Sequence, residues 1–280
     1  MFDRVTIVGL GLIGGSLGMA LRRKGLARRV VGIEPRLSAL KQARSKGAID
    51  EGFARLTPEN LDRSELVVIA TPPLAVVGVA KKLARWTRHS FILTDAASTK
   101  GEIVQILEKS LPSRISFIGG HPMAGSERSG IGAASPRLFS GAPCIVTRTP
   151  RTDKKALARV SGLWHSVGGH VVVLSPSRHD ALVAQISHVP HLVAVGLTRA
   201  TQPAALGLAA GGFSDTTRIA LGDPALWHEV CMTNRRKIAQ ALDRFLRELK
   251  SLRELVADGQ EGALLKRLRL AQRKRRQIHR

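Results

Sequence analysis

Residues 5–16 read VTIVGLGLIGGS. A short run suited to a buried strand leads directly into the glycine spacing G-x-G-x-x-G, and a helical stretch follows, which is the order of a strand, a tight turn and a helix. In such a turn the first glycine permits the sharp bend, the second lets the backbone approach a pyrophosphate, and the third allows the helix to pack closely on the strand. Free N–H groups at the start of the helix then point at the phosphates. The residues of the predicted dinucleotide-binding loop are Gly9, Gly11, Leu12, Ile13 and Gly14.

The choice of dinucleotide depends on Glu34, which follows the next apolar run about 20 residues after Gly14. A carboxylate at this point accepts hydrogen bonds from ribose hydroxyls and repels a 2′-phosphate, so Glu34 favours NAD. Arg36 follows closely and could pair with a 2′-phosphate, which leaves NADP open. Thr71, after the apolar run at 66–70, is the remaining residue that we expect to contact the cofactor.

Short apolar runs alternate with helical stretches over the first part of the chain. Several runs are continuously apolar and rich in Val and Ile, as strands buried on both faces of a sheet must be. Helices between them give a β-α-β order, which predicts a mostly parallel sheet. The predicted strands are 5–8, 30–33, 66–70, 91–94, 116–119, 144–147 and 171–174. We therefore expect an α/β domain of the Rossmann type over residues 1–175.

The character of the chain changes after Pro176, where one helical stretch follows another. Residues 226–257 show a long helical period with apolar residues three and four apart. Breaks between helices are expected at Pro190, Pro203, Gly211-Gly212 and Asp223-Pro224. Residues 176–280 are thus predicted to form an all-helical domain that ends in a basic tail.

Composition limits the classes of protein to which this chain can belong. At 280 residues, 44% of them hydrophobic, it is long enough for two folded cores. No apolar run is expected to be long enough to span a bilayer, and the N-terminus lacks the basic and apolar segments of a signal peptide. Cys144 and Cys231 are isolated and fit reduced thiols, so we expect a cytoplasmic protein without a metal site.

The net charge of +23 could mark a nucleic-acid binder or a surface that attracts small anions. Lys and Arg are scattered along the chain, with a denser run only at 266–280. Aromatic residues make up only 4% of the sequence, which is too few for the stacking platform of a nucleic-acid module. We therefore interpret the charge as a solvated surface and tail, and we do not expect a nucleic-acid partner.

The acid–base group of a dehydrogenase built on this loop is expected to be a histidine. The chain contains no tyrosine, which excludes a Tyr/Lys pair, and its two cysteines cannot build a catalytic zinc site. Histidine is the side chain best matched to neutral pH. His121 lies in the stretch GHPMAGSE (120–127), between turn residues that can present its imidazole to a substrate.

Three further segments carry candidate residues. DAASTK (95–100) follows a predicted strand and should lie near a bound nicotinamide. SHVPH (187–191) places two imidazoles close together, and Arg218 lies in GGFSDTTRIA (211–220). Taken singly, each has a structural explanation: a loop histidine caps a turn, Arg218 pairs with Asp215, and the two helical histidines are polar interface residues. Together they favour a site between the two domains.

In combination, these motifs make nearly the whole chain resemble the prephenate/arogenate dehydrogenases of tyrosine biosynthesis. The motifs GLGLIGGS, DAASTKG, GGHPMAGSE, SHVPHLVA and GGFSDTTRIA-x-x-DP-x-LW occur here in the family's order and approximate spacing. The middle and late motifs are specific, because generic Rossmann enzymes do not carry them. The sequence departs from the family at Glu34-Pro35, where many members have a Tyr-Asp pair, and at Ala97, where Gly is common.

The resemblance implies NAD-dependent oxidative decarboxylation: hydride leaves the carbinol carbon of the substrate ring, a base takes the hydroxyl proton, and carbon dioxide departs as the ring becomes aromatic. By motif match, His121 is that base, and Ser98 hydrogen-bonds the same hydroxyl or fixes the tautomer of His121. Arg218 binds a substrate carboxylate, and Trp227 packs beside the site. The other implied substrate contacts are His188, His191, Ser126 and Glu127. The resemblance also implies a homodimer formed by the helical domain.

Two other functions stay open at this point. A two-domain dehydrogenase of the β-hydroxyacid or imine-reducing type would share the layout, although such enzymes usually depend on a lysine in the helical domain. A non-catalytic nucleotide-binding protein with a basic docking tail would share the glycine-rich loop. The sequence also does not separate prephenate from arogenate, which differ in a keto group versus an amine.

Overall fold

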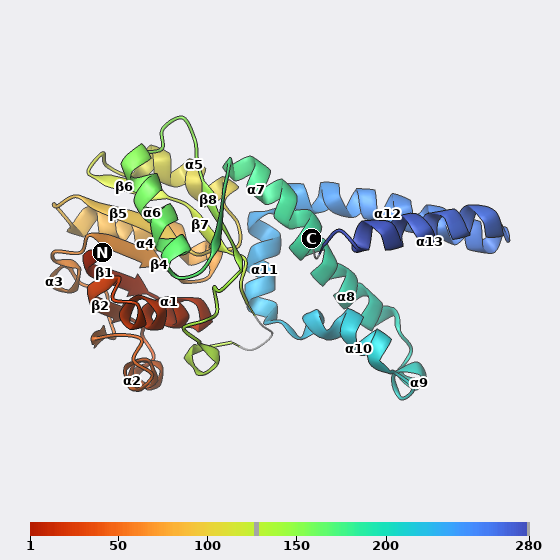
Figure 1. Cartoon of the computed structure of the whole chain (residues 1–280), viewed down its shortest axis with the longest axis horizontal. Helices are drawn as coiled ribbons and strands as arrows, with labels where there is room; N and C mark the ends of the chain where they lie inside the picture. Colours follow the sequence, from red (N-terminus) through yellow and green to blue (C-terminus); the bar gives the residue numbers. More distant parts are fainter. Residues whose placement is uncertain (126–128, 279–280) are drawn as a thin grey trace.

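The computed structural model describes residues 1–125 and 129–278. An α/β part and a helical part follow one another along the longest axis of the molecule (Figure 1). The α/β part ends with β9 (His170–Leu174), and the helical part begins with α7 (Pro176–Val183). The predicted architecture, a Rossmann-type sheet followed by helices, is therefore confirmed.

The α/β part is built on a six-stranded parallel sheet in the order β3-β2-β1-β4-β5-β6. Its strands are β1 (Phe2–Val8), β2 (Ala27–Ile33), β3 (Glu51–Phe53), β4 (Leu66–Ile69), β5 (Phe91–Asp95) and β6 (Ile115–Ile118). The helices of this part are α1 (Leu12–Arg23), α2 (Leu37–Ser45), α3 (Pro58–Leu61), α4 (Pro73–Trp86), α5 (Gly101–Ser110), the 3-10 turn η1 (Ile131–Ala133) and α6 (Lys154–Ser166).

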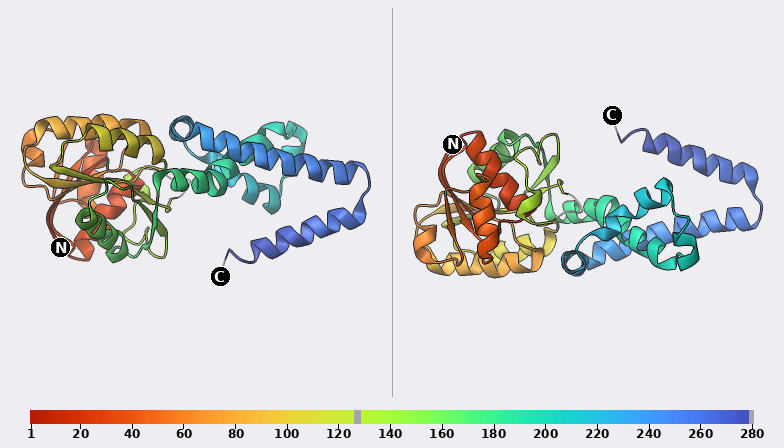
Figure 2. Two further views of the ribbon diagram at one scale, coloured as in Figure 1. Left: turned by 90° about the horizontal axis from the view of Figure 1, so that it is seen from above. Right: turned by 90° about the horizontal axis from the view of Figure 1, so that it is seen from below.

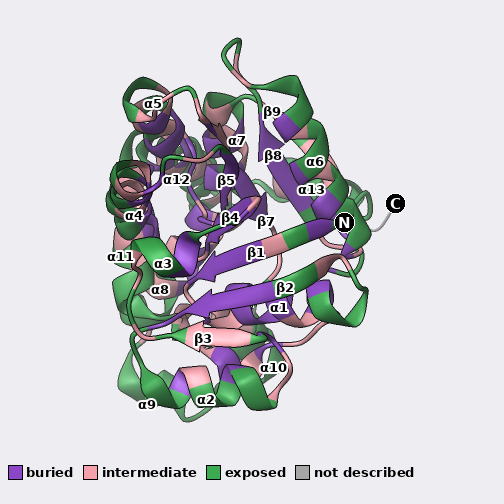
Figure 3. Ribbon diagram, turned by 90° about the vertical axis from the view of Figure 1, so that its left-hand side faces the viewer, coloured by how far each residue is buried: buried purple, intermediate pink, exposed green. Residues whose placement is uncertain are grey.

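Both faces of this sheet are covered by helices. Ile7 packs in one core with α1 and α6, whereas its neighbour Val8 packs in a second core with α4 and α5. The central strands are therefore buried along most of their length (Figure 3). Burial on two faces explains why these strands are continuously apolar in sequence.

Two of the predicted strands belong to a second sheet. The runs at 144–147 and 171–174 form a three-stranded sheet with β7 (Gly120–Pro122), which is antiparallel to β8 (Pro143–Thr147), whereas β8 and β9 are parallel. Neither β3 nor β7 was predicted, because three residues are too few to show a strand period.

The helical part follows most of the predicted breaks. After α7 its elements are the π-helical turn η2 (Ala184–His188), α8 (Val189–Ala200), α9 (Pro203–Leu206), α10 (Gly211–Thr217), the 3-10 turn η3 (Arg218–Leu221), α11 (Pro224–Thr233), α12 (Arg235–Ala257) and α13 (Glu261–Arg275). The breaks at Pro203, Gly211 and Pro224 are confirmed. The long helix predicted over 226–257 is divided at Asn234, which leaves the helical conformation with φ −123° and ψ 23°.

The break predicted at Pro190 was wrong, because the chain stays helical from Pro176 to Ala200. The turn before the proline is π-helical, and its extra residue helps the helix to accommodate a residue without an N–H. The resulting stretch is long and apolar enough to cross a membrane by length and composition, with a mean hydropathy of 1.4, contrary to our expectation. Core helices meet the same criterion, and this one carries the buried polar residues His179, Asp180, His188 and His191.

A helical hairpin, α12 and α13, projects away from the α/β part (Figure 1, Figure 2). Of its described residues only Ile238 and Ala241 are buried, both in the first half of α12. Exposed apolar side chains follow along both helices: Leu246, Leu249, Val256, Leu265, Leu268 and Leu270. Such a run of exposed leucines is typical of a surface that another molecule covers.

Candidate active site

The glycine-rich loop has the geometry of a dinucleotide site. Gly9 has φ +94°, which favours glycine, and a Cβ there would lie 2.7 Å from the carbonyl oxygen of Ala70. A Cβ on Gly14 would lie 2.0 Å from the carbonyl oxygen of Gly9, so α1 can pack this closely only on glycine. A Cβ on Gly11 would meet no atom of the described residues within 4 Å. This open space lies at the start of α1, which no side chain caps, so the loop fits a pyrophosphate.

The Glu34 carboxylate is already engaged by the protein. One oxygen accepts from the backbone N–H of Leu10 at 3.2 Å, and the other accepts from the backbone N–H and the Nε of Arg36 at 3.3 and 2.8 Å. Burial opposes ionisation, but these hydrogen bonds outweigh it and hold the pKa of Glu34 below its usual value. A ribose bound here would therefore meet an ion pair rather than the lone carboxylate that the sequence suggested.

Thr71 lies at the carboxyl end of β4, beside the loop. Its backbone nitrogen would be 3.2 Å from a Cβ on Gly9. The loops that follow β1, β2, β4 and β5 thus share one edge of the parallel sheet, which is where α/β folds bind their ligands.

A buried ion pair fixes the segment after β5. Lys100 Nζ donates to the carboxylate of Asp95, and both side chains are fully buried. Burial lowers the pKa of Lys100, while the adjacent carboxylate acts in the opposite direction. Asp95 also accepts from the backbone N–H groups of Ala97 and Gly120, each at 3.1 Å. The pair therefore ties the segment that carries Ser98 to the start of β7.

His121 lies in a strand, so our expectation that turn residues surround it was wrong. It belongs to β7, where it pairs with Ile145 of β8, and it is 8% exposed. Burial lowers the pKa of His121 well below its usual value, and His179 and Lys100 act in the same direction. The imidazole is therefore neutral at neutral pH, which is the form that can accept a proton.

Two residues of α7 that the sequence did not single out complete the surroundings of His121. His121 Nδ1 and His179 Nε2 are 2.8 Å apart, and His179 Nδ1 lies 2.8 Å from Asp180 Oδ1. Asp180 in turn accepts from the backbone N–H groups of Lys100 and Gly101, both at 2.8 Å. Adjacent residues near the start of a helix form no motif, so only the folded chain reveals this arrangement.

Ser98 is half-buried in the segment after β5, but it is not the partner of His121 Nδ1. His179 occupies that position, and the described residues include no hydrogen bond between Ser98 and His121. Of the two roles implied for Ser98, fixing the tautomer of His121 has no support from a hydrogen bond among the described residues. Contact with the substrate hydroxyl stays a prediction.

His188 Nε2 is a buried nitrogen without a hydrogen-bond partner among the described residues. Asn234 Nδ2 donates to the carbonyl oxygen of Asp180 at 3.0 Å and lies 3.2 Å from His188 Nδ1. Because a carbonyl oxygen can only accept, the Asn234 atom that faces it is the amide nitrogen. The same nitrogen faces His188 Nδ1, which must therefore accept. The proton of His188 then lies on Nε2, which is buried and unpaired. Burial lowers the pKa of His188 to about 4, so the ring is neutral.

His191 stacks on Trp227, with ring centroids 3.5 Å apart and planes at 7°. A Cβ on Gly222 would lie 2.5 Å from Trp227 Nε1, so the glycine makes room for this packing. Trp227 thus packs against His191, and its place beside a substrate site stays a prediction. His191 also hydrogen-bonds the backbone of Ile219, which places the turn that begins with Arg218 next to it. Arg218 itself is exposed, and Ser126 and Glu127 lie outside the described residues.

The α/β and helical parts meet at this site. Glu229 of α11 accepts from the backbone N–H of Leu74 in α4 at 3.0 Å, and the hydroxyls of Thr99 and Thr233 are also 3.0 Å apart. Together with the contacts of Asp180, these bonds bring the carboxyl edge of the sheet against α7 and α11. The structure thus brings the predicted residues of both parts to one junction.

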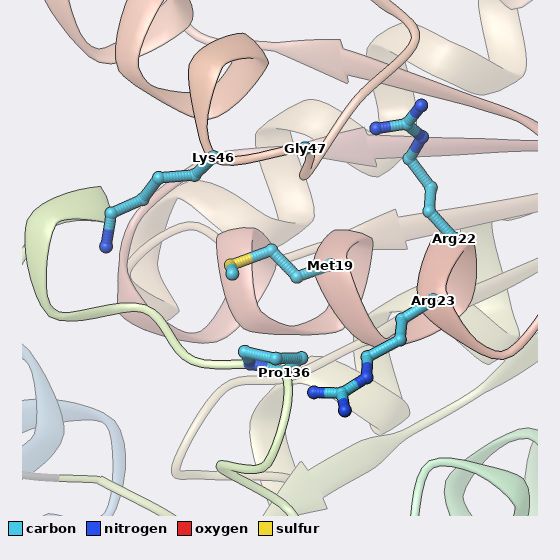
Figure 4. A pocket seen from close by; sticks show the side chains of 6 residues that line it. All are labelled: Met19, Arg22, Arg23, Lys46, Gly47 and Pro136. Atoms are coloured by element: carbon cyan, nitrogen blue, oxygen red, sulfur yellow. The ribbon is translucent and has the colours of Figure 1, made fainter.

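A separate basic pocket of about 330 Å³ lies at the other end of α1 (Figure 4). Its cations are Arg22, Arg23 and Lys46. Arg22 pairs with Asp50 at 2.9 Å, and Lys46 donates to the carbonyl oxygen of Gly132 at 2.7 Å. Two of the three cations are therefore already bound by the protein, and the pocket gives no support for a second anion site.

Comparison with known proteins identifies the family. Residues 17–173 match the nucleotide-binding domain of prephenate dehydrogenase, and residues 175–270 match its dimerization domain. The chain belongs to the prephenate dehydrogenase family.

Three relatives illustrate the similarity within the prephenate dehydrogenase family. The prephenate dehydrogenase of Bacillus subtilis is 36% identical over 263 residues, which are 91% of this chain and 71% of the relative. The structure of Aquifex aeolicus prephenate dehydrogenase with hydroxyphenyl propionate and NAD⁺ has a TM-score of 0.92 at 35% identity and covers 99% of both chains. Synechocystis arogenate dehydrogenase has a TM-score of 0.83 at 30% identity, over 98% of this chain and 99% of its own.

Proposed function

We propose that this protein is an NAD-dependent dehydrogenase of tyrosine biosynthesis that oxidatively decarboxylates prephenate or arogenate with His121 as the base. One observation carries the proposal: a neutral, buried imidazole lies where the helical part meets the sheet edge that bears the glycine-rich loop. Relatives over nearly the full chain are a prephenate dehydrogenase with NAD⁺ bound and an arogenate dehydrogenase.

The loop after β1 is assigned to the cofactor. The backbone N–H groups of its helix start would bind the pyrophosphate, and the Glu34–Arg36 pair would meet the adenosine ribose. When bound, NAD⁺ supplies the hydride acceptor. Because Arg36 can pair with a 2′-phosphate, NADP⁺ is the second candidate cofactor. The residues assigned to the cofactor are Gly9, Gly11, Leu12, Ile13, Gly14, Glu34 and Thr71.

We assign to His121 the removal of the proton from the hydroxyl group on the substrate ring. Removal of this proton lets the oxygen form a carbonyl as hydride leaves the same carbon, and the ring becomes aromatic when carbon dioxide departs. After that step His121 can return the proton to the aromatic oxygen, so no proton is gained or lost overall. General-base catalysis of this kind contributes about 10²–10⁴-fold.

We assign the binding of the substrate's anionic groups to the helical part. His188 Nε2–H is a neutral, buried donor that can hydrogen-bond a carboxylate or a keto oxygen. The Arg218 guanidinium has a fork of donors that matches a carboxylate, and its turn lies next to His191. Ser98 is assigned to the substrate hydroxyl. Ser126 and Glu127 keep the substrate-orienting roles that the motif implies.

We assign the helical hairpin to the interface of a homodimer. The family name of this region is a dimerization domain, and the exposed leucines of α12 and α13 supply the apolar surface that a second copy would cover. We divide the chain functionally at residue 175, with nucleotide binding in 1–175 and dimerisation in 176–280. The free thiols Cys144 and Cys231 are consistent with action in the cytoplasm.

The test is formation of reduced cofactor, followed by near-ultraviolet absorbance, with prephenate and arogenate offered separately and each combined with NAD⁺ and NADP⁺. We expect turnover with NAD⁺ and one or both substrates. His121→Asn should lose about 10²–10⁴ in kcat with unchanged NAD⁺ affinity, whereas His170→Asn, at an exposed position in β9, should behave as the wild type. Folded protein that binds NAD⁺ but turns over neither substrate would contradict the proposal.

A further inference from the structure

We propose that His179 and Asp180 are positioning residues that set the tautomer of His121, so that its Nε2 faces the substrate without a proton. This inference rests on the proposed function of His121 as the base. A continuous chain of contacts carries it, from Asp180 Oδ1 to His179 and from His179 Nε2 to His121 Nδ1, with 2.8 Å at each link.

The chain begins at a group that can only accept. Asp180 accepts backbone N–H groups of Lys100 and Gly101 at 2.8 Å, in addition to the contact with His179. Burial opposes ionisation, but these hydrogen bonds outweigh it and hold the pKa of Asp180 below its usual value. An ionised carboxylate has no proton to give, so His179 must donate from Nδ1.

The direction of the next hydrogen bond follows from the single proton of a neutral imidazole. Burial lowers the pKa of His179, so this ring is neutral and its one proton lies on Nδ1. His179 Nε2 therefore accepts, and His121 must donate from its own Nδ1. The other nitrogen, His121 Nε2, then carries the lone pair that a general base needs.

The charged groups around the chain support this assignment. Lys100 and Asp95 form a fully buried pair beside it, and the positive charge of Lys100 disfavours a second proton on His121 or His179. His188, on the next turns of the same helix, also disfavours a charge on His121. When His121 takes the substrate proton, the Asp180 carboxylate stabilises the resulting positive charge through His179, as the carboxylate of a catalytic triad does.

The chain also crosses from one part of the molecule to the other. His121 belongs to β7, whereas His179 and Asp180 belong to α7. Because His179 is fully buried, water cannot take its place. The base is therefore set for catalysis only when α7 is seated against β7 and the start of α5.

The direct test measures which ring nitrogen of His121 is protonated. In protein labelled with ¹⁵N-histidine and saturated with NAD⁺, ¹⁵N chemical shifts distinguish protonated from unprotonated ring nitrogens, and the spectrum of His121→Asn identifies the signals of His121. At neutral pH we expect a protonated Nδ1 and an unprotonated Nε2. The reverse pattern would overturn the proposal.

Two variants test the same point through activity. Asp180→Asn replaces the carboxylate that accepts from His179 with an amide that either donates or accepts more weakly. The ring protons of His179 and His121 are then no longer held on Nδ1. His179→Phe keeps a buried ring but removes both nitrogens. We expect each to lower kcat by about 10²-fold or more, with the KM for substrate and the NAD⁺ affinity near wild type. The matched control is Asp153→Asn, which removes an Asp that accepts from Ala156 N–H at 2.7 Å at the start of α6, outside the site.

The outcomes separate this inference from the proposed function. If wild-type protein turns over neither substrate, the ¹⁵N spectrum still decides the tautomer. If both variants fold, as judged by thermal unfolding, and keep kcat within about twofold of the wild type, the positioning role is refuted while His121 can remain the base. If a variant does not fold, the wild-type spectrum alone decides.

Discussion

Acidification should destabilise this protein through its buried histidines, and His188 allows the size of the effect to be calculated. In the folded protein burial lowers the pKa of His188 to about 4, from an ordinary 6.5. At a pH below 6.5 the unfolded chain binds a proton at His188 that the folded protein does not bind. The free energy of unfolding therefore decreases as the pH is lowered. The loss begins near the ordinary pKa and is complete near the folded one.

From these two pKa values, proton linkage gives a decrease in the free energy of unfolding of about 2 kcal/mol between about pH 7 and about pH 5. The decrease reaches about 3 kcal/mol once His188 is protonated in both the folded and the unfolded state. His121, His179 and His191 also have lowered pKa values, so their contributions have the same sign. The lowered carboxyl pKa values of Glu34 and Asp180 act mainly at lower pH, below their ordinary 4.5 and 3.8.

The assay is urea unfolding of the wild type and of His188→Asn over this range of pH. The variant should be less stable than the wild type at neutral pH, because its buried site is disrupted, but its stability should fall by about 2 kcal/mol less between the two pH values. His170→Asn, at an exposed position, is the control and should keep the wild-type slope. Equal slopes for the wild type and His188→Asn would refute the reasoning.

Three further predictions concern the cofactor loop, the substrate and the hairpin. Gly14→Ala places a Cβ within 2.0 Å of a carbonyl oxygen and should lower the free energy of unfolding, measured in urea, by about 1–3 kcal/mol or more. The Cβ of Gly11→Ala meets no atom of the described residues. This variant should fold normally but bind NAD⁺ more weakly in calorimetry. Normal stability of Gly14→Ala would contradict the packing argument. Arg218→Ala should raise the KM for prephenate and leave that for NAD⁺ nearly unchanged, and steady-state kinetics showing an unaltered prephenate KM would remove Arg218 from the site. Replacement of Leu249 and Leu268 by Glu should produce monomers in sedimentation velocity, and a wild type that is itself monomeric would exclude the homodimer.

The sequence predicted what depends on local pattern. The glycine loop, the order of the buried strands and the breaks at Pro203 and Pro224 each follow from a few adjacent residues, and all are present in the structure. The motif histidines were found for the same reason. Glu34 was identified, but its pairing with Arg36 changes what a ribose would meet.

The missed features depend on contacts between distant segments. His179 and Asp180 acquire a role only because α7 docks against β7 and α5, and no spacing in the sequence encodes that docking. The end of α11 at Asn234 has a similar cause, because the Asn234 side chain binds the backbone of α7. The strand at His121 depends on pairing with β8, which is remote in the chain.

The π-helical turn at Ala184–His188 holds one more residue than an α-helical turn would. The extra residue is accommodated within the turn, because the chain stays helical on both sides of it, from Pro176 to Ala200. Removing that extra residue would leave an ordinary α-helical turn between α7 and α8, and the helices on either side would keep their facing. The helix can therefore differ in length by one residue at this turn without separating the side that carries His179 from the side that carries His191.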